Sequence, residues 1–242
     1  MERRTLSRFL LAPAVAGTAL FGLSIAPVQA APAPAPAAHA WTSSDQWGTW
    51  TSPDGYTLYN DIWGSGAGSQ TIWADSSSTW GVTANHPATG GVKAYPNAKK
   101  VVDKPLSSLA SLTSSYNVTV PSGGAYNTSY DIWDTDYDYE VMLWVNYNGA
   151  VGPIGSQQAT VSLGGSQWAV YKGDNGSNQV FSFLRTSDSA SGTVDILPIL
   201  KWIEQQGWWR GETIGDVQFG YEITSSPGGM DFTTNRYSVS SR

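Results

Sequence analysis

The sequence predicts an all-β protein in which two antiparallel sheets pack as a jelly-roll sandwich, with one helix against a face. Three observations predict this fold class. The 242 residues include 26 Gly, 12 Trp and 12 Tyr, but only 13% of them are charged. Short runs that alternate apolar and polar side chains recur between turn-forming residues. One segment near the carboxyl end instead repeats its apolar residues at helical spacing.

Eight runs carry the strand pattern. In each of them, apolar or aromatic side chains occupy alternate positions, and turn-forming residues follow. The Gly164–Gly165 pair and the segment "GDNGSN" at 173–178 predict hairpin turns between neighbouring runs. The predicted strands are 56–63, 117–120, 127–133, 139–147, 158–163, 167–172, 179–185 and 215–224.

The helix is predicted within "TVDILPILKWIEQQGWW". Four apolar residues of this segment fall at i, i+3, i+4 and i+7 and so share one helix face: Ile196, Ile199, Leu200 and Ile203. Thr193 or Asp195 is expected to cap the amino end, because both have side-chain oxygens that accept backbone N–H bonds. Pro198 fits only in the first turn, and Gly207 is expected to end the helix.

The first 43 residues differ from the rest. Residues 1–30 have a basic start, an apolar stretch and a small-residue close at Ala30. This pattern predicts a secretory signal peptide rather than a membrane anchor, because the apolar stretch is short and interrupted. Residues 31–43 form an Ala/Pro-rich tether. Residues 44–242 have the length of one domain. We therefore expect a secreted, extracellular protein with no membrane contact after cleavage.

Charge and cysteine content exclude several function classes. The full sequence has a net charge of −6, and the first 30 residues hold three Arg and one Glu, so cleavage leaves −8. A surface of this sign does not favour nucleic acid or anionic lipid. The chain has no cysteine, so it offers neither disulfides nor thiol chemistry.

No metal or cofactor is expected. The chain lacks the ligands of a zinc site. Asp134, Asp136 and Asp138 begin like a calcium loop, but the required Gly and closing Glu are missing, so a solvated turn is predicted. His86 lies in the Pro/Gly-rich loop "ANHPATGG". It is predicted to be solvated rather than to belong to a Ser-His-Asp triad.

Two glutamates lie inside strands that are otherwise apolar or aromatic. In "YEVMLWVNY", alternate residues up to Tyr147 form the expected core face. The other face then holds Glu140 together with Met142 and Trp144. In "DVQFGYEIT", Glu222 likewise lies opposite a core face. A glutamate on a strand is usually solvated, but the apolar neighbours of Glu140 do not fit that explanation.

Other runs add carboxylates and aromatic rings to the same kind of face. Asp131 shares a face with Trp133, and Asp61 shares one with Trp63. Together such faces would form a groove that suits a sugar chain, because pyranose rings stack on aromatic side chains. Two carboxyl groups across a groove, one ionised and one protonated, are the minimal machinery for cleaving a glycosidic bond. The pattern alone also leaves open a non-catalytic sugar-binding sandwich or a structural role.

At these residues the sequence resembles glycoside hydrolase family 12, the small endo-β-1,4-glucanases that include xyloglucanases. The resemblance covers 44–242. "YEVMLWVNY" is similar to the strand that carries the family's nucleophile. Six further motifs occur in the family's order: "DQWGTWTSPDGYTLYNDIWGSGAGSQ", "VTANHPATGGVKAYPNAKK", "TSYDIW", "GPIGS", "GGSQWAVYKGDNGSNQVFSF" and "VQFGYEI". Seven motifs in order over one domain make the similarity specific.

The resemblance implies a catalytic domain over 44–242 whose inner sheet curves into an open cleft. It also implies a retaining mechanism through a covalent glycosyl-enzyme. Glu140 would be the nucleophile and Glu222 the general acid/base. Asp131 would hydrogen-bond the nucleophile and help to set its ionisation. The family works without a cofactor, so none is expected.

The resemblance also implies how a sugar chain binds. Trp63 and Trp144 would stack sugars on the non-reducing side of the cleaved bond. Three further residues would line the same region: Asn60, Asp61 and Met142. The segment "GPIGS", with Pro153 and Ile154, resembles the family's cord, a loop that crosses one end of the cleft. The expected partner is a β-glucan polysaccharide or oligosaccharide, and the protein is expected to be a monomer.

The sequence departs from the family in three places. Ser44 and a position near Thr71 stand where relatives often carry a disulfide, whose loss costs about 2–5 kcal/mol in other proteins. Asp61 stands where an Asn is usual beside the cleft Trp. The segment from Asp131 to Glu140 is shorter and more acidic than in many relatives. The preferred glucan stays open, and a xyloglucanase, a family 11 xylanase and a carbohydrate-binding module are the alternatives.

Overall fold

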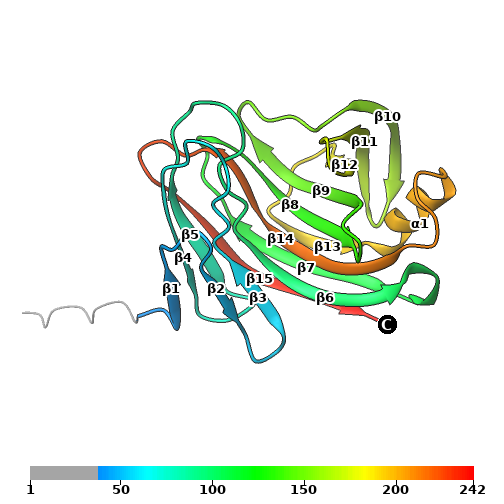
Figure 1. Ribbon diagram of the computed structural model, residues 1–242, viewed down its shortest axis with the longest axis horizontal. Coiled ribbons are helices and arrows are strands. Elements are labelled where there is room, and N and C mark those ends of the chain that lie inside the picture. Colours follow the sequence, from blue (N-terminus) through cyan, green and yellow to red (C-terminus); the bar gives the residue numbers. More distant parts are fainter. Residues whose placement is uncertain (1–37) are drawn as a thin grey trace, which may run out of the picture. The chain divides into compact units, whose positions relative to one another are not determined.

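The computed structural model describes residues 38–242 (Figure 1). The predicted signal peptide, 1–30, and residues 31–37 of the predicted tether lie outside the described residues. Within 38–242 the strands form two sheets, and one α-helix is present. The predicted fold class, an all-β jelly-roll sandwich with one packed helix, is confirmed. No helix in this part of the chain is long and apolar enough to span a membrane.

The larger sheet has nine strands in the order β10-β11-β12-β9-β8-β14-β6-β3-β2. Its neighbours pair antiparallel except β12 and β9, which are parallel. The strands are β2 (Thr49–Thr51), β3 (Tyr56–Tyr59), β6 (Asn97–Pro105), β8 (Ala125–Asp134), β9 (Tyr139–Asn148), β10 (Ser156–Leu163), β11 (Ser166–Asp174), β12 (Gln179–Arg185) and β14 (Thr213–Ser225). Figure 1 shows β6, β14, β8 and β9 running side by side through the molecule.

The smaller sheet has six strands in the order β1-β4-β5-β15-β7-β13. They are β1 (Trp41–Ser43), β4 (Ser69–Ala74), β5 (Trp80–Asn85), β7 (Leu112–Thr119), β13 (Ser191–Asp195) and β15 (Met230–Ser241). Only one of the eight predicted runs, 117–120, belongs to this sheet. A short 3-10 turn, η1 (Leu106–Ser108), precedes β7.

The core lies between the sheets and follows the strand period of two. On β14, alternate residues from Val217 to Ile223 have no exposed surface. Burying a large apolar side chain of this kind contributes about 1.5–3 kcal/mol. The central strand β8 is buried on both faces, with Tyr130 and Ile132 in the core cluster. The opposite face of β8, β9 and β14 is therefore the one that carries the candidate site.

The helix α1 (Leu197–Gln205) packs its predicted apolar face into the same core. Pro198 lies in its first turn, and Gly207, with a φ of 70°, follows its end as predicted. The predicted cap is wrong. The N-cap residue is Ile196, which makes no side-chain cap hydrogen bond, whereas Thr193 and Asp195 belong to β13 and pair with β7.

The run 56–63 is only half a strand. β3 ends at Tyr59, and the chain then bends at Asp61, whose φ of 41° lies in the left-handed region. Asp and Asn adopt this region more readily than most side chains. The bend separates Asp61 and Trp63 from the sheet, so they reach the site from a loop rather than from a strand.

Candidate active site

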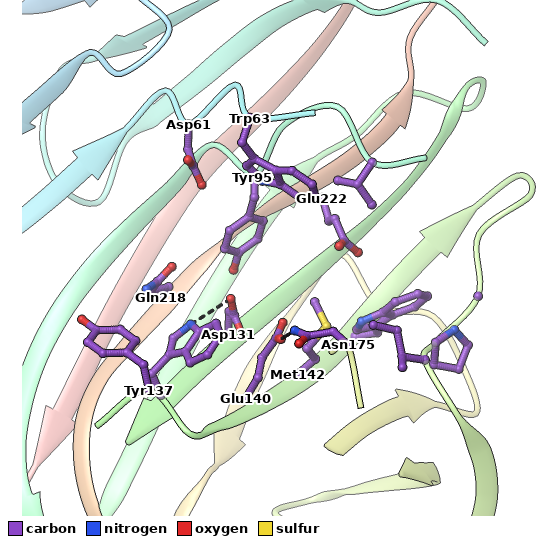
Figure 2. Close-up of a pocket in the computed structure, with 16 residues that line it drawn as sticks. Asp61, Trp63, Tyr95, Asp131, Tyr137, Glu140, Met142, Asn175, Gln218 and Glu222 are labelled. Atoms are coloured by element: carbon purple, nitrogen blue, oxygen red, sulfur yellow. Dashed lines mark hydrogen bonds between the residues drawn. The ribbon is translucent and has the colours of Figure 1, made fainter. Parts of the chain in front are cut away.

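A cleft of about 530 Å³ opens on the outer face of the larger sheet (Figure 2). Side chains from three adjacent strands form its floor, and loops form its walls. Its lining residues are Asp61, Trp63, Val92, Tyr95, Asp131, Trp133, Tyr137, Glu140, Met142, Trp144, Gly152, Pro153, Ile154, Asn175, Gln218 and Glu222. The faces that the strand period predicted do therefore meet in one cleft.

Nine of the ten sequence-predicted site residues line this cleft, and Asn60 is the exception. The Asn60 side chain has no exposed surface. It donates to the backbone oxygen of Asp45 at 2.8 Å and accepts from Gln70 at 2.9 Å. The bend after β3 thus turns the Asn60 side chain into the protein. The expectation that Asn60 contacts a sugar is corrected accordingly.

Three carboxyl groups come from three neighbouring strands. Glu140 is on β9, Asp131 on β8 and Glu222 on β14. In the β8–β9 ladder Trp133 pairs with Glu140 and Asp131 with Met142, so Asp131 lies diagonally beside Glu140. Glu222 pairs with Asn127 of β8. The two glutamates thus come from the strands on either side of β8, and their side chains point toward each other in the cleft (Figure 2).

Glu140 stands near the cleft edge and has one polar partner. The Asn175 amide donates to its Oε2 atom at 3.3 Å. Burial, together with the charge of Glu222, raises the pKa of Glu140 to about 7, although the Asn175 hydrogen bond acts in the opposite direction. A carboxyl group with this raised pKa can gain or lose its proton near neutral pH.

Glu222 is held from the neighbouring strand. The side-chain amide of Asn127 donates to its Oε2 atom. Burial raises the pKa of Glu222, and the Asn127 hydrogen bond offsets part of the rise. Gly220 on the same face has no side chain, which lets the backbone of Pro96 and Asn97 approach closely. This contact places the neighbouring Tyr95 in the cleft near Glu222.

Asp131 is the most enclosed of the three carboxyl groups. Its Oδ2 atom accepts from the Trp133 indole at 3.1 Å, while its buried Oδ1 atom has no hydrogen-bond partner among the described residues. Burial and the neighbouring Glu140 charge raise the pKa of Asp131 well above its usual range. This shift favours the protonated form, whose O–H can act as a donor.

Aromatic side chains flank the carboxyl groups at different depths. Trp63 is 51% exposed and presents an open ring face. Trp144 is 2% exposed and packs with Met142 in a small apolar cluster on the cleft side of the sheet. Tyr147 was predicted to lie in the core, but it is 37% exposed and its ring lies 6.0 Å from that of Trp144. Tyr147 therefore lies beside Trp144 outside the core, although it does not line the cleft.

The segment 152–156, which resembles the family's cord, contributes Gly152, Pro153 and Ile154 to the cleft lining. Ile154 is 42% exposed, and the following Gly155 lies against the backbone of Lys172 and Gly173 on β11. A Cβ atom on Gly155 would lie 2.0 Å from the Lys172 oxygen, and its φ of 87° also favours glycine. This close contact of Gly155 with β11 keeps Pro153 and Ile154 beside the cleft.

Asp61 adds a fourth carboxyl group at the rim. Its backbone oxygen accepts from the Tyr95 N–H at 2.9 Å, so the bend is tied to the segment that enters β6. Burial raises the pKa of the Asp61 side chain to about 6. A carboxyl group is thus present where the resemblance leads one to expect a neutral amide.

Several lining residues were not identified from the sequence. Trp133 and Gln218 had a signal, because the strand period places them on the cleft face. Tyr95, Tyr137 and Asn175 had none, since each comes from a loop or turn whose path depends on the fold.

Two expectations about polar residues were wrong. His86 was expected to be solvated but has no exposed surface. Asp134 was expected in a solvated turn but is 2% exposed, and it accepts from the N–H groups of Asp136 and Tyr139. Both side chains hold loops in place. Within 38–242 no cluster of three or more His, Asp or Glu side chains is arranged to hold a metal ion.

The site can perform acid/base and nucleophilic chemistry on one ligand. Glu140 and Glu222 approach from two sides, and their mutual repulsion favours a state in which only one of them is charged. Asp131 lies diagonally beside Glu140 in the β8–β9 ladder. The exposed rings beside these groups can stack on a sugar.

The chain is similar to several known proteins. The family described as glycosyl hydrolase family 12 matches residues 54–241. The probable xyloglucan-specific endo-β-1,4-glucanase A of Aspergillus terreus is 35% identical over 216 residues, covering 81% of this chain and 86% of the relative. Endoglucanase S of Pectobacterium parmentieri is 33% identical over 216 residues, covering 76% and 81%.

Solved structures show the same similarity. The xyloglucanase domain of NopAA, a type three effector from Sinorhizobium fredii solved with cellobiose, is 42% identical with a TM-score of 0.81. The match covers 85% of this chain and 100% of that domain. A cellulase derived from Cel12A of Rhodothermus marinus is 31% identical with a TM-score of 0.77, covering 84% and 99%.

Proposed function

The chain belongs to glycosyl hydrolase family 12, and from that membership we propose that it is an exported endo-β-1,4-glucanase that cleaves with retention of configuration. The observation that carries the proposal is that Glu140 and Glu222 line one cleft from the two strands that flank β8, beside exposed aromatic side chains. Export rests on the sequence pattern of residues 1–30.

Cleavage begins with a β-1,4-glucan lying along the cleft. Glu222 gives its proton to the glycosidic oxygen while a Glu140 oxygen attacks the anomeric carbon. The bond from that carbon to the leaving oxygen breaks, and a glycosyl ester forms on Glu140. Glu222, now ionised, removes a proton from a water molecule that attacks the same carbon. The ester bond breaks, and both carboxyl groups return to their starting states.

The carboxyl groups distribute their protons in a way that suits these roles. Part of the rise in the pKa of Glu140 comes from the charge of Glu222. A proton on Glu222 removes that repulsion, so Glu140 ionises more easily when Glu222 is neutral. Asp131 has an unpartnered oxygen, and a hydrogen bond from its protonated form to Glu140 would favour the Glu140 carboxylate. The starting state is thus ionised Glu140 and protonated Glu222.

The walls position the glucan for this reaction. Trp63 offers an open ring face, and the Met142–Trp144 surface forms an apolar floor beside Glu140. The cord, with Pro153 and Ile154, limits the cleft at one end. Sugar stacking on these surfaces would fix the anomeric carbon near Glu140, and such positioning accounts for a large part of enzymatic rate enhancement.

Xyloglucan is a specific second candidate for the substrate. The Aspergillus terreus relative and the Sinorhizobium fredii domain are both named as acting on xyloglucan, whereas other relatives are named endoglucanase or cellulase. Both substrates share a β-1,4-glucan backbone. The same two glutamates would cleave either one, and the cleft walls would decide the preference.

The test is release of reducing ends from carboxymethylcellulose, mixed-linkage β-glucan, xyloglucan and xylan. Release from a glucan supports the proposal, and the ranking names the substrate. Release from xylan alone would make the protein a xylanase, and binding without release would make it a carbohydrate-binding module. Proton NMR of a cello-oligosaccharide digest then decides the mechanism, because a first product with α configuration would rule out retention.

A further inference from the structure

Trp63 and Asp61 reach the cleft from residues 60–63, a stretch without regular secondary structure (Figure 2). The other two residues of this stretch face inward: Asn60 is 0% exposed and Ile62 is 9% exposed. The N–H groups of Asn60 and Ile62 donate to the backbone oxygens of Gly48 and Gln46, and the oxygen of Ile62 accepts from the Gln46 side chain. The backbone oxygen of Asn60 is left to find its partner elsewhere in the protein.

Three buried side chains supply a continuous series of hydrogen bonds to this stretch. Gln70 donates from Nε2 to the backbone oxygen of Asn60 at 2.6 Å and to its Oδ1 atom at 2.9 Å. Asn60 in turn donates to the backbone oxygen of Asp45. At the other end, His86 Nε2 lies 3.0 Å from Gln70 Oε1, and Gly68 N–H donates to His86 Nδ1 at 3.0 Å. We call His86, Gln70 and Asn60 the hydrogen-bond relay.

Only one arrangement of protons satisfies the relay. A backbone N–H can only donate, so His86 Nδ1 must be an unprotonated acceptor toward Gly68. The proton of the neutral ring then lies on Nε2 and points to Gln70 Oε1. This orients the Gln70 amide, whose N–H groups face Asn60. Each donor along the series then meets an acceptor, and a fully satisfied buried network specifies a single arrangement of its side chains.

The surroundings of His86 favour the neutral ring that this arrangement requires. His86 has no exposed surface, and its backbone N–H and oxygen are both bonded to Ser226. Lys93, 2% exposed, donates to the backbone oxygen of Ser65. Burial and the nearby Lys93 charge lower the pKa of His86. The relay therefore joins β4, which carries Gln70, to the loops that carry Asn60 and His86.

We propose that His86, Gln70 and Asn60 are positioning residues for glucan binding, which hold the 60–63 bend so that Trp63 presents its ring to the substrate. The proposal rests on the proposed glucanase function for its kinetic readout. The relay lies behind the bend and touches neither Glu140 nor Glu222. Its loss is therefore expected to weaken substrate binding and to leave the bond-breaking step unchanged.

The kinetic test compares His86→Leu, which removes both ring contacts, with His86→Gln, whose amide can still donate to Gln70. On a soluble glucan, His86→Leu should raise KM about tenfold with little change in kcat, and His86→Gln should restore most of the loss. Ser114→Ala is the matched control. It deletes another buried hydrogen bond, from Ser114 to Ser238 in the smaller sheet, and should leave KM unchanged.

A double-mutant cycle separates positioning from general destabilisation. If His86 acts through Trp63, the effect of His86→Leu on KM should largely disappear in a Trp63→Ala background. An equal effect in both backgrounds would overturn the proposal. If His86→Leu cannot be recovered folded, Gln70→Glu replaces it, because a carboxylate cannot donate to Asn60.

Crystal structures of the wild type and His86→Leu decide the proposal independently of activity. Displacement of residues 60–63 and of the Trp63 ring supports it. An unmoved ring would overturn it, even if the wild type cleaved every glucan tested. A wild type that cleaves no glucan would instead contradict the proposed function, and the relay would still be judged by the position of Trp63.

Discussion

The Asn175 side-chain amide donates a hydrogen bond of 3.3 Å to the Glu140 carboxylate from the turn between β11 and β12. The orientation of this amide is defined by the turn. Its Oδ1 atom accepts the backbone N–H groups of Ser177 and Asn178 at 2.9 and 2.8 Å, so Nδ2 faces Glu140. A residue from a surface turn thus sets part of the electrostatics of the proposed nucleophile.

Asn175→Ala is expected to move the acid limb of the pH profile of kcat/KM to higher pH. The Asn175 hydrogen bond lowers the pKa of Glu140, so its loss raises that pKa and leaves less of the ionised nucleophile in acid. At pH 5 we expect kcat/KM to fall about three- to tenfold. Asn235→Ala, which removes an exposed amide on the smaller sheet, is the control. An acid limb that does not move would contradict this role.

Asp61→Asn is expected to stabilise the protein at pH 7 but not at pH 4. Burial raises the pKa of folded Asp61 to about 6, above the unfolded value near 3.9. Between these values the folded state binds more protons, so the stability of the wild type falls as pH rises. The substitution removes this penalty, and its gain at pH 7 should be about 1–2 kcal/mol.

Denaturant unfolding at both pH values measures the Asp61 effect. Asp103→Asn is a matched control, because Asp103 is exposed and also has a positive φ, 46°. It should change stability equally at the two pH values. An Asp61→Asn gain that is the same at pH 4 and pH 7 would show that backbone preference, rather than the buried charge, is responsible.

A disulfide is expected to form between Cys residues introduced at Ser44 and Thr71. The two side-chain oxygens lie 2.7 Å apart, at the positions that the family resemblance associates with a disulfide. The crosslink should raise the free energy of unfolding by about 2–4 kcal/mol. Unfolding curves with and without a reductant measure it, with each single Cys variant as a control. Two titratable thiols after oxidation would contradict the expected geometry.

The side of the sheet on which each strand residue lies could be predicted, but only where the strand alternation continues without a bulge. Parity placed Glu140 and Trp144 of β9 on the cleft side. It failed at Tyr147, because the β8–β9 register shifts between Ser129, which pairs with Trp144, and Thr128, which pairs with Asn146. The extra residue reverses the alternation beyond it. A bulge depends on the neighbouring strand and leaves no mark in the sequence of its own strand.

Buried polar residues were harder to predict, because their partners are distant in sequence. His86 looks like a solvated loop residue until Gln70 and Ser226 are brought to it. Asn60 has the alternation of a strand residue, but the bend at Asp61 belongs to a loop that the relay holds. Long-range hydrogen bonds decided both positions, whereas local pattern was sufficient for Asp131 and Glu222.

The central claim is that Glu140 attacks the glucan, and the most direct measurement is reducing-end release by the wild type and Glu140→Gln. We expect the substitution to lower kcat by at least about 1,000-fold while thermal unfolding and glucan binding persist, because an amide cannot attack the anomeric carbon. Glu204→Gln, on the exposed side of α1, should keep full activity. A Glu140→Gln variant that retains most of the wild-type rate would contradict the account.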